Sequence, residues 1–333
     1  MKSKKISTYE KTLEIIKSTS AMPADTALAT LVECIKNGHA LAAARAVQAI
    51  ARLSHPTVVP GLIDIYNWLE ADSRKRDQSC NTRIAIAEAL GNCGLPLAID
   101  TLRKAVRTIQ IGRLGPTPED LAIGLRATAA IALAKVDSDA LYELSLLLFD
   151  EKPDTPTSPI NVPFVKAPVR KAAAQAIGIL GDTGGMAILA VKLKFPGNEV
   201  ADVIVECLES LISVRPPYLM EIVKPYLMGD DGYISALTAL SLAENLGIEV
   251  LGLLCETLES VSGDAKEAIV IAISVIRASG IRQILFEFLS HPNAFVRRGA
   301  VKGIKTYMDD AVREKLKEMR DNDPDKYVRL EAE

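Results

Sequence analysis

A segment that begins with an arginine and continues with small and apolar residues recurs four times in this chain of 333 residues. The segments begin at Arg83, Arg126, Arg170 and Arg297, and the residue seven positions later is apolar in each: Leu90, Leu133, Ile177 and Ile304. Apolar residues recur every three or four positions within each segment, the period of one helix face. The sequence therefore predicts a repeated helix that buries the same face in each copy.

A second helix is predicted after each of these segments. Pro56 and Pro96 take the same place in their segments, and Thr183 takes it in a third. Proline is tolerated there because the first helical turn has no intrahelical partner for its N–H. Pro56 and Pro96 are 40 residues apart, and later steps are about 30 to 35, the length of a two-helix repeat. We expect about eight helix pairs and no sheet.

The composition favours the same fold class. Apolar residues make up 49% of the chain and aromatic residues only 5%. A core of Ala, Leu, Ile and Val suits close-packed helices, whereas β-sandwiches and barrels use more aromatic and β-branched residues. The predicted fold class is therefore all-α.

This pattern resembles the HEAT repeat, specifically the arginine-plus-alanine variety of the phycobilisome-lyase-like (PBS lyase) group, from about Leu41 to Leu330. The resemblance implies a right-handed α–α superhelix. In such a solenoid the first helix of each pair is expected on the outer side and the second on the concave side. We expect capping helices over residues 1–40, the repeat solenoid over 41–308 and a polar cap or tail over 309–333, all in one domain.

Charge, cysteine content and hydropathy restrict the compartment and the class of partner. The net charge of −3 provides no global cationic field for nucleic acid or an anionic membrane. The five cysteines are far apart, which favours reduced thiols over a disulfide framework. Residues 1–17 lack the apolar stretch of a signal peptide, and the longest apolar run, Ala268–Ile276, is about half a bilayer span. We expect a cytoplasmic protein.

Three consecutive connections between predicted helix pairs are long. They cover Ala71–Asn81, Gln110–Glu119 and Glu151–Ala167, whereas connections within pairs are tight. Because connections between pairs emerge at one edge of a solenoid, we expect the three to project side by side. Long connections tend to be functional or disordered, and neutral insertion is an open alternative because loop length costs little.

The stretch from the first long connection into the second is basic. Residues 74–113 carry eight basic and three acidic side chains, about +5 in all, and residues 114–164 carry about −5. Arg103 and Arg107 are four apart on a second helix and share one face, with Ile99, Leu102, Val106 and Ile109 on the other. This spacing directs the two arginines towards the concave groove, although a solvated helix face balanced by Asp100 is an alternative.

Trp68, the only tryptophan, precedes the first long connection. It could anchor a partner or fill a gap between repeats. We predict that an acidic partner protein binds one basic patch at the concave rim. The patch consists of Trp68, Arg74, Lys75, Arg76, Arg103, Arg107 and Arg113.

The repeat arginines Arg83, Arg126, Arg170 and Arg297 are interpreted differently, because a residue present once per helix pair points to a structural role. We expect these arginines to bond helix ends or acids of adjoining repeats, such as Asp182.

The sequence shows no convincing catalytic constellation, and we expect neither enzymatic activity nor a cofactor or metal. The three histidines, His39, His55 and His291, lie at pair junctions, and none belongs to an HExxH motif. The glycines of residues 178–185 lack a P-loop lysine and suit helix termination. The HEAT-like hydroxylase of a lysine derivative uses repeated His-Glu pairs, which this chain lacks.

Two catalytic alternatives remain open. A bilin lyase resembles the chain in its repeats but brings no matched catalytic residue. A HEAT-like DNA glycosylase needs a basic groove with several aromatics, which an acidic chain with one tryptophan fits poorly. The favoured hypothesis is a non-enzymatic scaffold that binds a partner through its concave face and long-loop edge.

Overall fold

The computed structural model describes residues 7–53, 55–113, 115–116, 118–150 and 167–333. Most of these residues are helical, which confirms the all-α class. One short ribbon interrupts the helices, in which β1 (Ile111–Gly112) pairs antiparallel with β2 (Glu119–Asp120). The expectation of no sheet is therefore wrong at this place, because the connection after Gln110 folds back on itself.

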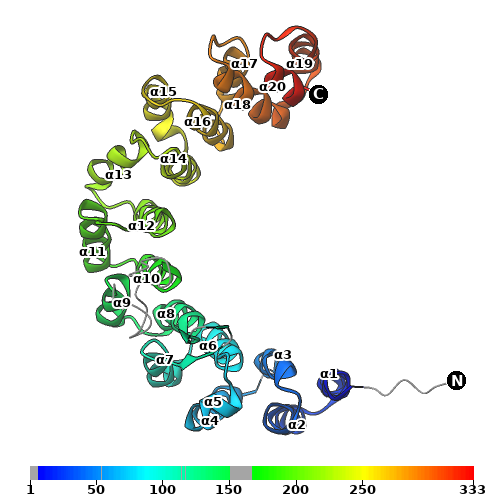
Figure 1. Ribbon diagram of the computed structural model, residues 1–333. Helices are drawn as coiled ribbons and strands as arrows, with labels where there is room; N and C mark the ends of the chain where they lie inside the picture. The colour runs from blue at the N-terminus through cyan, green and yellow to red at the C-terminus, as the bar shows by residue number, and fades with distance from the viewer. Residues whose placement is uncertain (1–6, 54, 114, 117, 151–166) are drawn as a thin grey trace, which may run out of the picture. The chain divides into compact units, whose positions relative to one another are not determined.

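The chain forms two compact units, residues 1–188 and 189–333, with the boundary inside α11 (Thr183–Lys194). Each unit is a stack of helix pairs, the solenoid architecture that the repeats predict (Figure 1). Before α11, unit 1 contains α1 (Thr8–Ser18), η1 (Thr19–Ala21), α2 (Ala24–Asn37), α3 (Ala40–Ala51), α4 (Val58–Ala71), α5 (Ser73–Arg76), α6 (Asn81–Cys93), η2 (Pro96–Ala98), α7 (Ile99–Ala105), the ribbon, α8 (Ile123–Val136), α9 (Leu141–Leu148) and α10 (Ala167–Leu180).

Unit 2 follows the same alternation. It contains α12 (Ala201–Val214), α13 (Leu219–Leu227), α14 (Gly232–Leu246), η3 (Gly247–Val250), α15 (Leu251–Ser260), α16 (Asp264–Val275), α17 (Ile281–Phe288), α18 (Ala294–Ile304), η4 (Lys305–Tyr307), α19 (Asp310–Asn322) and α20 (Lys326–Glu331). The boundaries between the repeat solenoid and its two caps, at residues 40 and 308, remain a prediction.

Small residues set how closely the helices of unit 1 stack. The repeat-arginine helices α6, α8 and α10 form one row with α3, and α2, α4, α7 and α9 form the other (Figure 1). A Cβ added to Gly91 on α6 would lie 2.6 Å from Cβ of Ala132 on α8. Glycine thus lets these two helices approach as neighbours in the row.

The two rows correct one expectation. Within unit 1 the row that contains α6, α8 and α10 lies on the inner side of the unit's curve, and α4, α7 and α9 lie on the outer side (Figure 1). The prediction that the second helix of each pair lines the concave side is wrong here. Arg103 and Arg107, which α7 and its C-terminal turn carry, therefore belong to the outer row.

The predicted starts of the second helices hold to within two residues. Pro96 begins η2, which leads into α7, and Thr183 begins α11. Pro56 lies in the turn that precedes α4, which begins at Val58. Proline thus fixes the turn or the first helical residue without removing a helical hydrogen bond.

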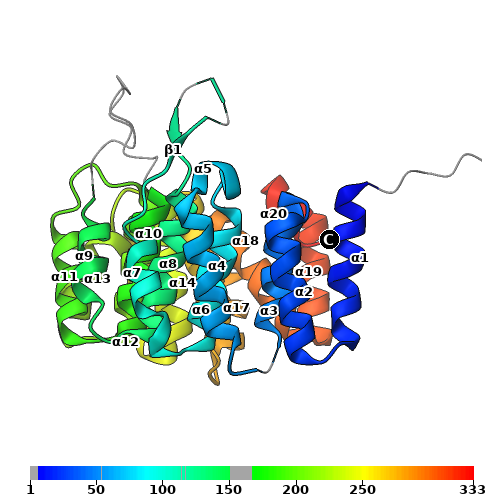
Figure 2. The ribbon, with the colours of Figure 1, turned by 90° about the horizontal axis from the view of Figure 1, so that it is seen from below.

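The first two long connections project from the same edge of unit 1. Figure 2 shows α5, within the connection after Ala71, beside β1 of the connection after Gln110. Most of the third predicted connection, residues 151–166, lies outside the described residues. We call the edge formed by α5 and the ribbon the long-loop edge.

One helical stretch of unit 2 has the length and hydropathy of a membrane span. It covers Gly232–Ser260, 29 residues, with a mean hydropathy of 1.4 over its most apolar window. The chain turns within it at Gly247, whose φ is 59°, so that α14 and α15 are two helices of a pair. The core helix of a soluble protein can be as long and as apolar as this stretch. The cytoplasmic location therefore stays a prediction.

Candidate functional site

The first repeat arginine is locked into the start of its own helix. Arg83 is 1% exposed and its Nε lies 3.1 Å from Oδ2 of Asp77. The Asp77 carboxylate also accepts hydrogen bonds from the backbone N–H groups of Thr82 and Arg83, at 3.0 and 3.1 Å. One buried acid therefore neutralises the arginine and satisfies the first turn of α6.

The second repeat arginine repeats this arrangement. Arg126 forms an ion pair with Asp120, also six residues earlier, and its Nη1 donates to the carbonyl oxygen of Thr108 at 2.9 Å. The Asp120 carboxylate accepts from the backbone N–H of Gln110 and of Ala122, each at 3.0 Å. The ion pair thus closes the base of the ribbon.

Gln110 joins the two arginine sites. Its Oε1 accepts from Nη2 of Arg83 at 2.5 Å, and its Nε2 donates to the carbonyl oxygens of Asp77 and Gln78 at 3.2 and 2.6 Å. We call Asp77, Arg83, Gln110, Asp120 and Arg126 the buried network. Because its members satisfy one another, the network holds both long connections in place.

The other repeat arginines also have structural partners. Arg297 donates to both carboxylate oxygens of Asp323, at 2.8 and 2.9 Å, and Arg170 donates to the carbonyl oxygen of Asp150 at 3.4 Å. These contacts confirm the predicted structural role. Asp182 was named as a possible partner, and its carboxylate instead accepts from the backbone N–H of Gly185 at 2.5 Å.

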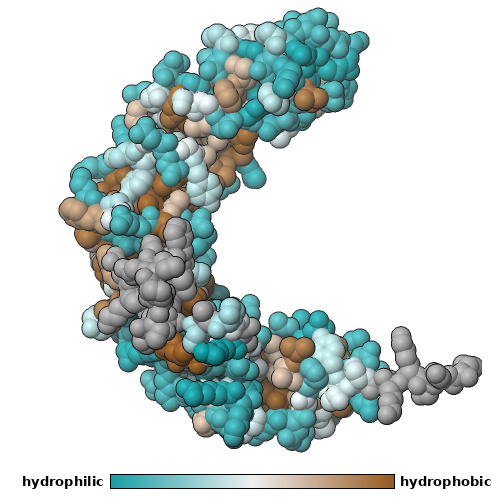
Figure 3. Space-filling view, viewed as in Figure 1, coloured by the Kyte–Doolittle hydropathy of each residue, from teal (hydrophilic) through white to brown (hydrophobic). Residues whose placement is uncertain are grey.

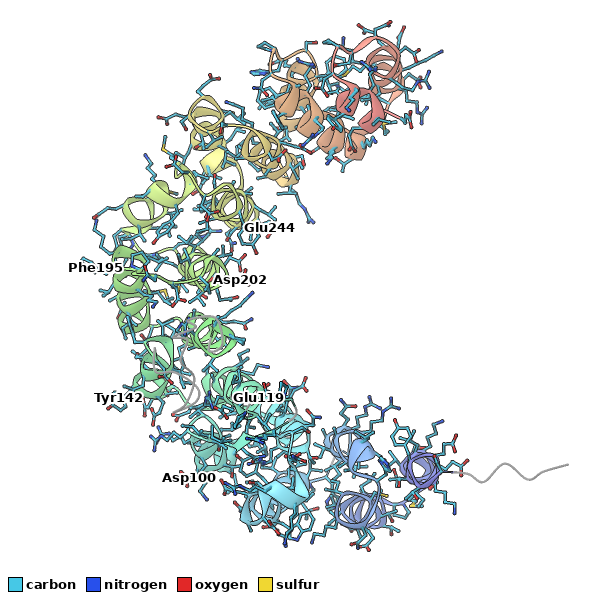
Figure 4. All side chains as sticks on the ribbon, viewed as in Figure 1. Asp100, Glu119, Tyr142, Phe195, Asp202 and Glu244 are labelled. Carbon is cyan, nitrogen blue, oxygen red and sulfur yellow. The ribbon has the colours of Figure 1, made fainter. Side chains whose placement is uncertain are left out.

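A cleft of about 780 Å³ opens beside the buried network, and we call it the charged cleft. Its walls come from the end of α4, from α5, from α7 with the turn after it, and from α9. Figure 4 shows Asp100 on α7 and Tyr142 on α9, both directed away from the inner row. The lining residues are Glu70, Ser73, Arg83, Asp100, Arg103, Lys104, Arg107, Thr108, Ile109, Gln110 and Glu143.

Acids of the next repeat partly neutralise the two predicted arginines in this cleft. Nη2 of Arg103 lies 2.7 Å from Oδ2 of Asp137, and Nη2 of Arg107 lies 3.1 Å from Oε1 of Glu143. The Arg107 side chain is nonetheless 65% exposed, against 35% for Arg103. Arg103 therefore serves mainly to join repeats, while Arg107 remains accessible to a partner.

The predicted apolar face of this helix is only partly realised. Leu102 and Val106 are buried, but the Ile109 side chain is exposed. The reason is that α7 ends at Ala105, so that Ile109 no longer continues the helical spacing.

Trp68 is half-buried and contacts two cations. The guanidinium carbon of Arg76 lies 4.3 Å from the centre of the indole ring, and Nζ of Lys36 on α2 lies 5.7 Å from it. Nη1 of Arg76 also donates to the carbonyl oxygen of Trp68 at 2.5 Å. The indole thus holds α5 against α4, and Arg76 is partly engaged.

Three of the predicted cations remain available at the long-loop edge. Arg74 and Arg113 are exposed and have no ion pair with any described residue. Nζ of Lys75 lies 3.7 Å from Oδ2 of Asp72 on the surface. We call Arg74, Lys75 and Arg113 the edge cluster. The structure therefore divides the predicted patch into the edge cluster, the Trp68–Arg76 contact and the charged cleft. Figure 3 shows mainly hydrophilic residues around α4 and α5 on this side of the molecule.

Sequence reasoning missed Gln110, Asp77 and Asp120. The signal for the two acids is present, because each stands six residues before a repeat arginine and just before a helix. A repeated Asp-x5-Arg spacing indicates a side chain that caps a helix and also pairs with its arginine. Gln110 has no such signal, because the partners of its side chain are 27 to 33 residues away.

The histidines have local partners. Nε2 of His55 lies 3.4 Å from Oδ1 of Asp25, and its Nδ1 lies 2.7 Å from Oγ1 of Thr57. Nδ1 of His39 and of His291 accepts a backbone N–H two residues later, as turn residues do. Burial raises the pKa of Cys80 to about 11 and that of Cys207 to about 12, which keeps both thiols protonated. No three His, Cys, Asp or Glu side chains of the described residues gather as metal ligands.

Two family models match parts of the chain, HEAT repeats at residues 251–333 and the PBS lyase HEAT-like repeat at residues 82–108. The chain therefore contains HEAT repeats, including one of the kind that its sequence resembles. The second match covers α6 and α7, which border the charged cleft. No curated protein matches the chain.

Among solved structures, the chain is similar to human deoxyhypusine hydroxylase in complex with glycerol. The identity is 14%, the match covers 90% of this chain and 96% of that chain, and the TM-score is 0.26. A likeness at this level carries no argument about activity.

Proposed function

We propose that the chain is a non-enzymatic HEAT-repeat scaffold in the cytoplasm that binds an acidic partner protein at the long-loop edge of unit 1. The observation that carries the proposal is the exposure of the edge cluster on connections that the buried network holds in place. Exposed cations on a preorganised surface lose little conformational freedom when a partner binds. The repeats themselves support a scaffold and do not identify the partner.

The charged cleft extends this surface. Arg107 is two-thirds exposed although it pairs with Glu143, so a carboxylate of the partner can share or replace that contact. Lys104, also exposed, has no ion pair with a described residue. The edge cluster attracts an acidic surface from a distance, and the cleft provides specific contacts after encounter.

The proposed binding surface lies on the outer row of unit 1, because α7 and α9 belong to that row (Figure 1). The proposal therefore does not place Arg103 and Arg107 on the concave side, where the sequence predicted them. Trp68 is assigned a positioning role, since Arg76 and Lys36 already contact its ring. The partner is expected to contact Arg74, Lys75, Arg107 and Arg113.

Affinity purification of the whole chain from its native cells, with mass spectrometry of the co-eluting proteins, tests the proposal. The variant combines Arg74→Glu, Arg107→Glu and Arg113→Glu. The control variant is Arg277→Glu, an exposed arginine of unit 2 that has no ion pair with a described residue. We expect a protein with an acidic surface to co-purify with the wild type and with the control, and to be lost from the triple variant.

Equal recovery with all three forms contradicts the proposal. Transfer of a bilin to a co-purified acceptor, followed by its absorption spectrum, would instead support the bilin-lyase alternative. Duplex DNA binding that weakens with salt and accompanies base release would support the glycosylase alternative.

A further inference from the structure

We propose that a groove between α1 and α3 is a second docking surface, which takes an acidic amphipathic helix of a partner protein. The groove has a volume of about 1040 Å³ and lies within unit 1, away from the charged cleft. We call it the α1–α3 groove. Its lining residues are Leu13, Ile16, Lys17, Thr19, Ser20, Arg45, Gln48, Ala49, Arg52 and Leu53.

The charge of the groove is of one sign. Lys17, Arg45 and Arg52 line it, all three are exposed, and none forms an ion pair with a described residue. No acid is among the described residues that line it. The charged cleft differs in this respect, because Glu70, Asp100 and Glu143 line it together with its cations. An occupant with carboxylates would therefore meet unmatched cations in the α1–α3 groove.

The apolar residues come mainly from the α1 wall. Leu13 and Ile16 are three apart on α1 and half-buried, and Leu53 closes the groove beyond the end of α3. Figure 3 shows hydrophobic residues at this end of unit 1, among α1, α2 and α3. Half-buried apolar side chains gain from further burial, so the occupant must bring apolar side chains of its own.

The opposite wall is a straight stripe of one helix. Arg45, Gln48 and Ala49 of α3, together with its C-cap residue Arg52, recur at the spacing of a single helix face. The side chain of Ala49 is small and leaves space in the middle of this wall, between Arg45 and Arg52. A rod-shaped ligand between two helices fits this form, and the volume is enough for about two helical turns. Helix-in-groove recognition uses such anchors at i, i+3, i+4 and i+7.

Other anionic ligands fit the groove less well. Nucleic acid brings phosphates but no aliphatic side chains for Leu13, Ile16 and Leu53. A membrane presents a broad surface, which a groove between two helices meets only at its rims. The combination of unmatched cations with an apolar wall favours an amphipathic acidic helix.

A fluorescent peptide of fifteen residues serves as the probe. It places leucines at i, i+3, i+4 and i+7 and glutamates at the flanking positions, and its anisotropy is titrated with the whole chain. Two control peptides replace glutamate by lysine or insert a central proline, which breaks the helix. Vesicles of phosphatidylserine and a short duplex DNA are titrated in parallel.

We expect binding of the acidic helical peptide alone, weakened by salt and weakened at least about tenfold by Arg45→Glu combined with Arg52→Glu. Ala49→Trp fills the groove without a change of charge and should weaken binding comparably. Circular dichroism and the thermal midpoint establish that both variants fold. The matched control Arg74→Glu, on the long-loop edge, should leave peptide affinity unchanged, which separates this surface from the one proposed above.

Three results overturn the inference. They are the absence of peptide binding up to about 1 mM, equal affinity of the groove variants and the wild type, and equal affinity for the proline-containing peptide. Tighter binding of vesicles or DNA through the same arginines would assign the groove to that ligand instead.

Discussion

Nη2 of Arg83 donates a hydrogen bond to Oε1 of Gln110 at 2.5 Å, across 27 residues of sequence. Arg83 stands in the first turn of α6, and Gln110 stands where the ribbon begins. This contact fixes the spacing between the connection that carries Arg74 and Lys75 and the connection that carries Arg113. Consequently, the positions of the edge cations depend on a residue that no partner needs to touch.

Replacement of Gln110 by alanine tests the buried network. The variant removes a buried hydrogen-bond partner from Nη2 of Arg83 and from the carbonyl oxygen of Asp77, and a half-buried one from the carbonyl oxygen of Gln78. We expect a loss of about 2 kcal/mol in the free energy of unfolding, measured by urea denaturation. Lys104→Ala, an exposed change nearby, should stay within about 0.5 kcal/mol of wild type. Equal stability of the two variants would show that the network contributes nothing.

Close packing of α6 on α8 predicts a cost for the smallest side chain at Gly91. A methyl group there would lie 2.6 Å from Cβ of Ala132, so one helix must shift. We expect Gly91→Ala to destabilise the protein by about 1 to 3 kcal/mol, seen as a lower thermal midpoint. Gly252 is the control, because a Cβ there meets open space within α15. Gly252→Ala should be neutral or stabilise by up to about 1 kcal/mol.

The two cleft arginines should differ in their contribution to stability. Arg103→Ala removes the cation beside Asp137 and Glu143, whose side chains are 7% and 10% exposed. We expect it to destabilise by about 2 kcal/mol or more, because the buried Asp137 carboxylate loses its cation, whereas Glu143 keeps Arg107. Arg107→Ala should cost less than about 1 kcal/mol, since its side chain is mostly exposed. Chemical denaturation of both variants checks the order, and the reverse order would exclude the structural role of Arg103.

Alkaline pH should destabilise the folded chain through its buried thiols. Burial holds the pKa of Cys80 at about 11 and that of Cys207 at about 12, whereas an unfolded thiol titrates near about 8.5. Because the folded pKa is the higher one, this stability is fully present below pH about 8.5 and is lost as the pH rises towards 11. Urea midpoints should therefore be level from pH about 7 to 8 and fall above pH about 9. The fall should be smaller in Cys207→Ala, and an equal fall would remove Cys207 as a cause.

The sequence predicts the stack of helix pairs because the arginine and the small residues that pack neighbouring helices recur at a regular spacing. The structural role of Arg83 and Arg126 follows from their recurrence, but their partners, Asp77 and Asp120, were not predicted although each stands six residues earlier. The inner and outer rows could not be predicted in this way. Which helix lies inside depends on how successive pairs rotate, and no single residue records that rotation.

The candidate site was harder to predict because its charges are matched by distant residues. Local counting finds Arg103 and Arg107 but not Asp137 and Glu143, which lie 34 to 40 residues along the chain. Trp68 is another example, since Lys36 of an earlier helix reaches its ring. Counts of basic residues therefore overstate the charge that remains free for a partner.

The most direct test of the central claim measures the association rate of the purified partner as a function of salt. Wild type, the Arg74→Glu, Arg107→Glu and Arg113→Glu triple variant, and the Arg277→Glu control are compared by surface plasmon resonance between about 50 and 500 mM salt. We predict at least about tenfold slower association of the triple variant at low salt, a shallower salt dependence, and unchanged behaviour of the control. Equal association rates of the triple variant and wild type at low salt would contradict binding at the long-loop edge.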